Sequence, residues 1–147
     1  MQIDKFLNSS PIFHTYLLFE KIFSPFQKEL KQEGLTFIQS MILTAIFFEE
    51  KQVTPTSLAN CLNTSSSNIS HALKHLLRKN WILKNKDKED SRKVLLKLTT
   101  QGNKVVLKLI QIYNDTQNIF EEDFGEKAVL TWNKKSRAFI EVYRKNQ

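Results

Sequence analysis

Residues 54–80 read TPTSLANCLNTSSSNISHALKHLLRKN, and this stretch has the pattern of two short helices joined by a tight turn. Thr54 followed by Pro55 is typical of a helix start, because threonine caps unpaired amides and proline fits the first helical position. Asn63 belongs to the few residue types that adopt the left-handed backbone conformation, which suits a turn after the first helix. The stretch therefore predicts a helix-turn-helix.

The second of these helices has one apolar face and one polar, basic face. Ser65 or Ser66 is placed to cap its start, and Asn80 is placed to end it. Its apolar positions repeat at helical spacing, at Ile69, Ala72, Leu73 and Leu76. The candidate contact residues at its start and on its outer face are Ser66, Ser67, Asn68, Ser70, His71, Lys74 and Arg78. Since the major groove of B-DNA admits one helix, this face is a candidate DNA contact.

Residues 81–98 are predicted to form a strand pair with a charged tip. The first strand covers residues 81–83, the turn residues 84–92, and the returning strand residues 94–98, where alternate apolar residues face one way. Such a hairpin can lay Arg92 or a lysine along the minor groove while the helix occupies the major groove. For an isolated polar helix, a solvated surface is the commoner explanation. The hairpin that follows it favours DNA.

The charge of the chain is concentrated in the same region. The net charge is +7 and the isoelectric point is about 9.5. Nine basic and three acidic residues lie at positions 74–97, which accounts for +6 of that charge. A field so concentrated attracts a polyanion, although a basic, soluble surface is the alternative on charge alone.

Helices are predicted on both sides of this region. An N-terminal helical run is expected to be kinked or split at Ser24 and Pro25 and to end at Gly34. A core helix and two amphipathic C-terminal helices are predicted to follow Thr36, Gly102 and Gly125.

Two parts of the chain match a known family. Residues 56–82, TSLANCLNTSSSNISHALKHLLRKNWI, and residues 90–102, DSRKVLLKLTTQG, resemble the winged helix-turn-helix of the MarR family of bacterial transcription regulators. The family's wing reads Asp, any residue, Arg, then an alternating strand that ends in Leu-Thr and a nearby glycine. Those positions here are Asp90, Arg92, Leu98, Thr99 and Gly102. The order of elements agrees over nearly the whole chain, and the motif-level similarity covers about residues 54–102.

The resemblance implies a mode of DNA binding. Arg92 would enter the minor groove with Asp90 bracing the wing, and Lys88 is a further candidate contact at the tip. The recognition helix would carry Ser67, Asn68, His71 and Lys74. The terminal helices would interlock in a homodimer, which would place two recognition helices about one DNA turn apart on a pseudo-palindromic operator.

The predicted fold class is α+β, mostly α: a winged helix-turn-helix with long N- and C-terminal dimerisation helices. Residues 1–147 are assigned to a single domain. Its DNA-binding lobe is predicted at about residues 36–100, and its dimerisation helices at about residues 1–33 and 101–147.

The chain departs from the family's usual pattern at three places. Asn80 stands where a glycine usually follows the recognition helix, and asparagine can make the same turn. The pair Lys84 and Asn85 replaces the usual basic residue that opens the wing. The recognition helix also carries two histidines, so its base preference does not transfer from relatives.

Aromatic residues in the first helices suggest an effector. Phe13, Tyr16, Phe19 and Phe37 could line a pocket for a small aromatic molecule, as in many members of the resembled family. At this spacing, aromatic residues more often belong to a core or a dimer interface.

Other chemistry has little support in the sequence. His71 and His75 have a spacing that can bind zinc, but no carboxylate or cysteine stands beside them, and we predict neither a metal nor a cofactor. Cys61 is predicted to be packed and inert. The sequence contains no phosphate-binding glycine loop, GxSxG or HExxH motif, so we predict that the chain is not an enzyme.

The sequence thus predicts a cytoplasmic, homodimeric, DNA-binding transcription regulator. A repressor is the preferred form, because blocking a promoter requires only binding, and a small-molecule effector would release it. The apolar run at residues 41–48 is too short to span a membrane, and the N-terminus has no signal-peptide pattern. The alternatives are a winged-helix module that binds a protein, and a metal- or redox-operated sensor.

Overall fold

The computed structural model describes residues 2–49, 52–87, 90 and 92–147. The chain divides into two compact units, one that ends at Ile110 and one that covers Gln111–Gln147. The first contains the N-terminal helices, the helix-turn-helix, the hairpin and the start of a long helix, and the second consists of helix alone. In the described part of the chain, none of the helices combines the length and apolarity needed to span a bilayer.

The N-terminal helices form an interrupted run. Helices α1 (Gln2–Ser9) and α2 (Pro11–Leu18) are followed by a π-helical segment, η1 (Phe19–Phe23), and by α3 (Ser24–Gln32). The predicted interruption at Ser24 and Pro25 coincides with the end of this π-helical segment. Proline lacks the amide for an α-helical bond and its ring clashes with the carbonyl four residues earlier, so the preceding turn widens. Gly34, with φ of 73°, ends the run as predicted.

Helix α4 (Phe37–Phe48) is the predicted core helix. Thr36 caps it reciprocally with Gln39: the Thr36 amide donates to the Gln39 side chain at 3.0 Å, and the Gln39 amide donates to the Thr36 hydroxyl at 3.4 Å. Ile42 and Leu43 are fully buried. Because the helix is apolar on most sides, it can contact several elements at once.

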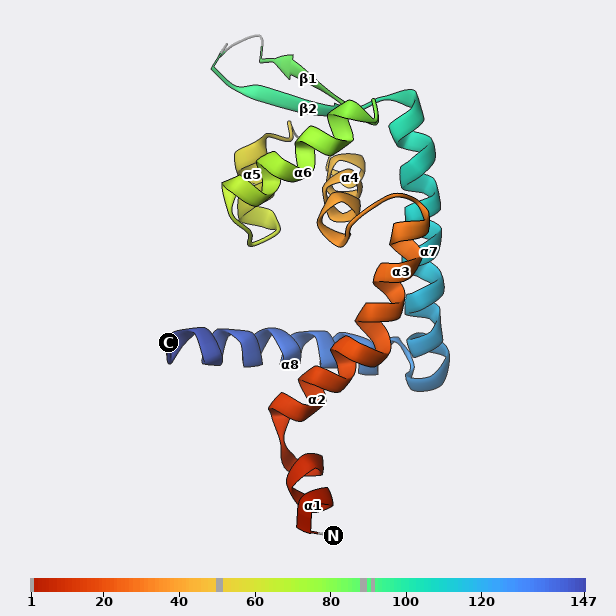
Figure 1. The fold of residues 1–147 in the computed structure, drawn as a ribbon, viewed down its shortest axis with the longest axis vertical. Coiled ribbons are helices and arrows are strands. Elements are labelled where there is room, and N and C mark those ends of the chain that lie inside the picture. Colours follow the sequence, from red (N-terminus) through yellow and green to blue (C-terminus); the bar gives the residue numbers. More distant parts are fainter. Residues whose placement is uncertain (1, 50–51, 88–89, 91) are drawn as a thin grey trace. The chain divides into compact units, whose positions relative to one another are not determined.

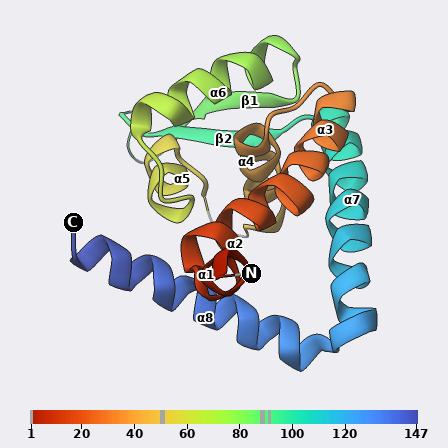
Figure 2. The ribbon, with the colours of Figure 1, turned by 60° about the horizontal axis from the view of Figure 1, so that its bottom comes forward.

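The hydrophobic core of the first unit joins the helix-turn-helix to the hairpin. Helices α4, α5 (Pro55–Cys61) and α6 (Ser66–Arg78) lie against the hairpin in both views (Figures 1 and 2). Buried side chains come from all these elements, from α3 and from the first part of α7 (Thr100–Phe124). They include Leu30, Ile42, Leu43, Leu58, Ile69, Leu76, Ile82, Leu96, Val106 and Leu109. Each such aliphatic side chain contributes about 1.5–3 kcal/mol on burial.

The hairpin pairs β1 (Ile82–Lys86) with β2 (Val94–Leu98) in antiparallel register, from Ile82 opposite Leu98 to Lys86 opposite Val94. Leu96 also bridges to Val53, whose carbonyl accepts the Leu96 amide at 2.8 Å. The first strand is longer than predicted, since the expected turn began at residue 84. Backbone pairing with β2 extends the strand through polar residues that carry no strand signal of their own.

The C-terminal unit is helical. Helix α7 begins in the first unit and its C-terminal half belongs to the second, where α8 (Glu126–Lys145) follows. Gly125 separates the two helices, as predicted, and its φ of 79° is one that glycine adopts readily. The large apolar side chains of α8 that are exposed are Leu130, Trp132, Phe139, Ile140, Val142 and Tyr143.

Candidate nucleic-acid interface

The predicted helix-turn-helix is confirmed in α5 and α6. Thr54 caps α5: its amide donates to the Ser57 hydroxyl at 2.9 Å, and its own hydroxyl accepts the Ser57 amide at 3.1 Å. Asn63 then adopts φ of 49°, and the Thr64 amide donates back to the Ala59 carbonyl at 3.0 Å. This is the left-handed helix end that reverses a chain tightly, and it fixes the angle at which α6 leaves the turn.

The start of α6 is held by a side-chain cap. Of the two predicted caps, Ser65 is the one used, and its hydroxyl accepts the Asn68 amide at 3.1 Å. The Asn68 side-chain amide donates to the Thr64 hydroxyl at 2.9 Å, so this side chain also braces the turn. Ser66 and Ser67 are left exposed at the helix start, where the helix dipole favours an anion.

The outer face of α6 is exposed over its whole length. All seven candidate contact residues on it are exposed: Ser66, Ser67, Asn68, Ser70, His71, Lys74 and Arg78. The opposite face is buried at the four positions predicted for it, which are Ile69, Ala72, Leu73 and Leu76. The helix therefore presents hydroxyl, amide, imidazole and cationic groups on a rigid support, and these groups can bond base edges or phosphates.

The two histidines of α6 have different surroundings. His71 is exposed, whereas His75 is half-buried and its ring lies edge-on to Trp81, with the ring centroids 6.4 Å apart. His75 Nδ1 is 3.3 Å from a terminal nitrogen of Arg78. Among the described residues, no three potential ligand side chains are grouped as a metal site requires. His75 therefore belongs to the packing of α6 against the hairpin.

The wing tip carries an ion pair between two of the predicted site residues. Arg92 Nε donates to Asp90 Oδ1 at 3.1 Å, and the Arg92 backbone amide donates to the same oxygen at 3.1 Å. The Arg92 side-chain bond, followed by the backbone bond, holds the pKa of the Asp90 carboxyl below its usual range. The carboxyl is therefore ionised at neutral pH, and the contact is lost only when the pH falls through this lowered pKa. Lys88 lies outside the described residues.

Thr99 and Gly102 fix the base of the wing to the end of α6. The Thr99 hydroxyl donates to the Asn80 carbonyl at 2.7 Å and accepts the Gly102 amide at 2.9 Å. The Thr99 amide donates to the Trp81 carbonyl at 3.0 Å. Asn80 has φ of 55° and makes the left-handed turn that follows α6. These contacts connect the recognition helix, the wing and α7, and explain the Leu-Thr-x-x-Gly spacing.

The sequence model of the family of transcriptional regulators SarA/Rot matches residues 21–109, which contain the helix-turn-helix and the wing. The chain belongs to the SarA/Rot family. The family consists of transcriptional regulators and not of enzymes.

Named relatives of this SarA/Rot family chain cover most of its length. The HTH-type transcriptional regulator SarZ of Staphylococcus haemolyticus is 28% identical over 127 residues, which is 86% of each chain. SarZ of Staphylococcus epidermidis is 26% identical over 119 residues, 81% of this chain and 78% of the relative.

Solved structures share the fold of this SarA/Rot family chain. The complex of Staphylococcus aureus MepR with DNA superimposes with a TM-score of 0.80 at 18% identity, over 91% of this chain and 96% of that one. A MarR family transcription regulator superimposes with a TM-score of 0.77 at 19% identity, over 98% of this chain and 93% of that one. The mostly helical winged helix-turn-helix fold and the resemblance to MarR-type regulators are thus confirmed.

Cys61 is exposed, so the prediction that it is packed was wrong. It is the last residue of α5, a helix of 7 residues that buries only Leu58 and Ala59. So short a helix has a narrow inner face, and a position one turn after Leu58 already lies at its edge.

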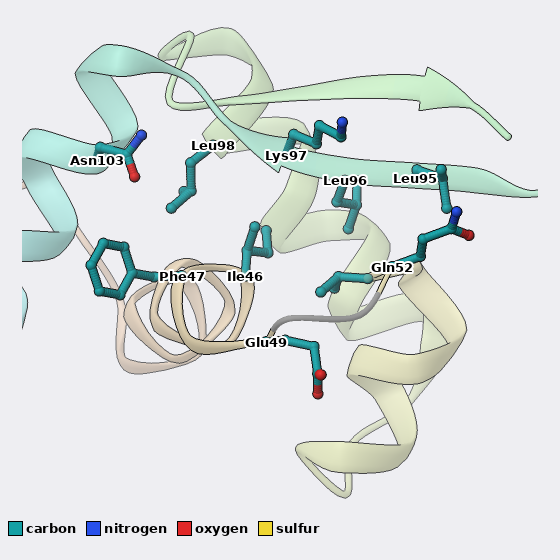
Figure 3. Close-up of a pocket in the computed structure, with 10 residues that line it drawn as sticks. Ile46, Phe47, Glu49, Gln52, Leu95, Leu96, Lys97, Leu98 and Asn103 are labelled. Carbon is teal, nitrogen blue, oxygen red and sulfur yellow. The ribbon is translucent and has the colours of Figure 1, made fainter.

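The aromatic residues considered for an effector pocket are divided between packing and solvent. Phe37 contacts Phe23 and Phe26, with ring centroids 5.0 Å and 6.3 Å away, whereas Tyr16 and Phe19 are exposed. An open groove lies elsewhere in the first unit, between the end of α4 and β2, where Ile46 and Leu96 point toward each other (Figure 3). None of the four predicted aromatic residues lines this groove. Control by a small aromatic effector stays a prediction.

Proposed function

We propose that the chain is a sequence-specific, homodimeric repressor that binds a pseudo-palindromic operator in the cytoplasm. The observation that carries this proposal is the fixed arrangement of an exposed, basic recognition helix and an exposed wing arginine. Both belong to the same compact unit, and Thr99 and Gly102 connect their supports. Occupying promoter DNA would be sufficient for repression.

The recognition helix supplies the base contacts in this proposal. Ser67, His71 and Lys74 stand at positions i, i+4 and i+7 of α6 and are exposed. These positions form one stripe along a helix, so all three can face the floor of a major groove together. The exposed Ser66 at the helix start is suited to approach a phosphate.

The wing supplies a minor-groove contact. The Arg92 side chain is 90% exposed, and a single Asp90 oxygen holds its Nε. Such an exposed ion pair contributes little to stability. Its effect is to orient the guanidinium group, and a narrow minor groove attracts arginine through its negative potential.

Exposed apolar side chains on the terminal helices favour the homodimer. In the first unit they include Ile3, Phe6, Ile12 and Tyr16, and in the second they include Trp132, Phe139 and Ile140. Monomeric soluble proteins seldom expose this much large apolar surface. A second copy that buries these faces would also supply the second recognition helix, which a pseudo-palindromic operator requires.

The test is fluorescence anisotropy of the protein with the DNA directly upstream of its own gene, against a shuffled duplex, across a salt series. We expect the upstream DNA to bind more tightly, and log affinity to fall with log salt by about 0.9 per phosphate neutralised. Equal, weak and steeply salt-dependent binding to both would place the operator elsewhere. The absence of binding even at low salt would favour a protein-binding winged helix instead.

Two sets of substitutions should separate positioning from base recognition. We expect Arg92→Ala to weaken binding to every sequence by about tenfold, because it removes a contact that carries little sequence information. Lys74→Ala or His71→Ala should change which sequences are preferred, at a cost of about 1–3 kcal/mol for each base that the helix no longer bonds. Selection from a randomised DNA pool measures the preference. Recovery of the wild-type consensus by the α6 variants would contradict the assignment of the helix.

A further inference from the structure

The wing contains a buried carboxylate at Asp87. Asp87 is 8% exposed, and it is the one buried charged residue among those that the structure describes. The neighbouring Lys86 and the returning Arg92 and Lys93 are all exposed. Burying a carboxylate is costly unless hydrogen bonds compensate. The bonds made by Asp87 therefore bear on what the wing tip does.

Asp87 begins a series of bonds that ends at Arg92. The Asp87 Oδ1 atom accepts the Asp90 backbone amide at 2.9 Å. The Asp90 Oδ1 atom in turn accepts both the backbone amide and Nε of Arg92, each at 3.1 Å. The Asp87 carboxylate thus holds the backbone of Asp90, and the Asp90 carboxylate holds Arg92.

Two backbone hydrogen bonds also hold Asp87 and Asp90 in place at the wing tip. The Asp87 amide donates to the Lys93 carbonyl at 3.0 Å, and the Lys93 amide donates to the Asp90 carbonyl at 2.9 Å. The first of these bonds continues the pairing of β1 and β2 by one residue beyond Lys86 and Val94. Asp87 is therefore anchored to the hairpin on its backbone side and to Asp90 on its side-chain side.

We infer that Asp87 is a positioning residue that sets the direction of Arg92 through Asp90. The inference rests on the proposed function, because it assigns Arg92 to DNA. An arginine that is 90% exposed samples many rotamers, and fixing it beforehand lowers the entropy lost on binding. The Asp90 carboxylate can fix the arginine only if the Asp90 backbone is itself fixed. The Asp87 side chain holds the Asp90 amide, next to the bond by which Lys93 holds the Asp90 carbonyl.

A purely electrostatic role and a positioning role for Asp87 predict opposite changes in DNA affinity when its carboxylate is removed. A carboxylate close to DNA repels phosphates, so on charge alone its removal should tighten binding. If Asp87 positions Arg92, its removal should weaken binding. Asp87→Asn separates the two effects, because asparagine keeps an Oδ1 acceptor and loses the charge.

The first experiment compares operator affinity for Asp87→Ala, Asp87→Asn and Asp123→Ala. The last is a control that removes one exposed carboxylate from α7 in the other unit. We expect about threefold to tenfold weaker binding for Asp87→Ala, as for removal of one hydrogen bond, and changes within about twofold for the other two. Unchanged or tighter binding by Asp87→Ala, or equal losses for Asp87→Ala and Asp87→Asn, would overturn the inference.

The second experiment places Asp87→Ala in an Arg92→Ala background. If Asp87 acts through Arg92, the substitution should change affinity by less than about twofold there, because the group it positions is already gone. The same loss in both backgrounds would mean that Asp87 acts on the wing as a whole, and the inference would fail.

The third experiment uses the free protein, so its result does not depend on DNA. Amide hydrogen exchange of Arg92 should become about tenfold faster in Asp87→Ala, with core amides such as that of Ile42 unchanged and with near wild-type exchange in Asp87→Asn. Unchanged exchange at Arg92 would overturn the inference. A wild-type protein that failed to bind DNA would contradict the proposed function, and the exchange result would still decide whether Asp87 holds Arg92.

Discussion

Gly102→Ala is expected to destabilise the protein by about 3 kcal/mol, which combines overpacking with weakened hydrogen bonds. A Cβ atom at this position would lie 1.9 Å from the Trp81 carbonyl oxygen and 2.9 Å from the Trp81 carbonyl carbon. Both atoms are backbone, so no side-chain rotation can relieve the clash. The same oxygen accepts the Thr99 amide, and moving it would strain the base of the wing.

Helix propensity alone predicts the opposite change in stability. Gly102 is the third residue of α7, and replacing a glycine in a helix with alanine ordinarily stabilises by up to about 1 kcal/mol. Thermal unfolding measures the result, and a loss of about 3 kcal/mol should lower Tm by roughly 6–12 °C in a chain of this size. Gln101→Ala is the control, because the preceding residue is exposed in the same turn.

We expect Gly102→Ala to weaken DNA binding as well as to destabilise the protein. Because Thr99 and Gly102 connect α7 to the end of α6, a shift there moves the wing relative to the recognition helix. DNA affinity of the folded Gly102→Ala variant should therefore fall by at least about tenfold. A variant with wild-type or higher Tm would show that the backbone relaxes readily and that steric fit does not explain this glycine.

The local features of this fold could be predicted because they depend on near neighbours. The caps at Thr36, Thr54 and Ser65 act on amides three residues later, and the left-handed turns at Asn63 and Asn80 are intrinsic to asparagine. The inner and outer faces of α6 followed from helical period alone.

Features set by distant residues could not be predicted. Position 102 requires glycine because a Cβ atom there would clash with the Trp81 carbonyl, which is 21 positions earlier in the chain. The length of β1 is set by pairing with β2, and the burial of Asp87 by the folded hairpin tip. Charge at the tip predicted an exposed turn and gave no indication that one of its carboxylates would be internal.

The candidate site shows the same division. Periodicity predicted that Ser67, His71, Lys74 and Arg78 would lie on the outer face of α6, and all four are exposed. It did not predict that Asn68 would bond Thr64, nor that His75 would pack beside Trp81 while His71 stays exposed. Those differences depend on the turn and on the hairpin, which lie outside the helix itself.

Phe139→Asp is expected to dissociate the proposed homodimer and to weaken operator binding by about 100-fold or more. Phe139 is 66% exposed on α8, next to the exposed Ile140. Burying a carboxylate among apolar side chains of a second copy would be strongly unfavourable. Loss of the dimer would leave each recognition helix to bind one half-site alone, and two linked sites typically gain 10²–10⁴ in avidity over one.

Ala138→Asp is the matched control for this substitution. Helical period places Ala138 about 120–160° around α8 from Trp132, Ile140 and Tyr143. Ala138→Asp introduces the same charge and the same poor helix former as Phe139→Asp. Sedimentation at micromolar concentration should show a dimer for the wild type and for Ala138→Asp, and a monomer for Phe139→Asp. A dimer in all three would remove α8 from the interface, because a carboxylate at its most exposed aromatic position would then have no cost. A wild-type monomer that still binds the operator tightly would mean that one recognition helix and one wing are sufficient, and the pseudo-palindrome would lose its physical basis.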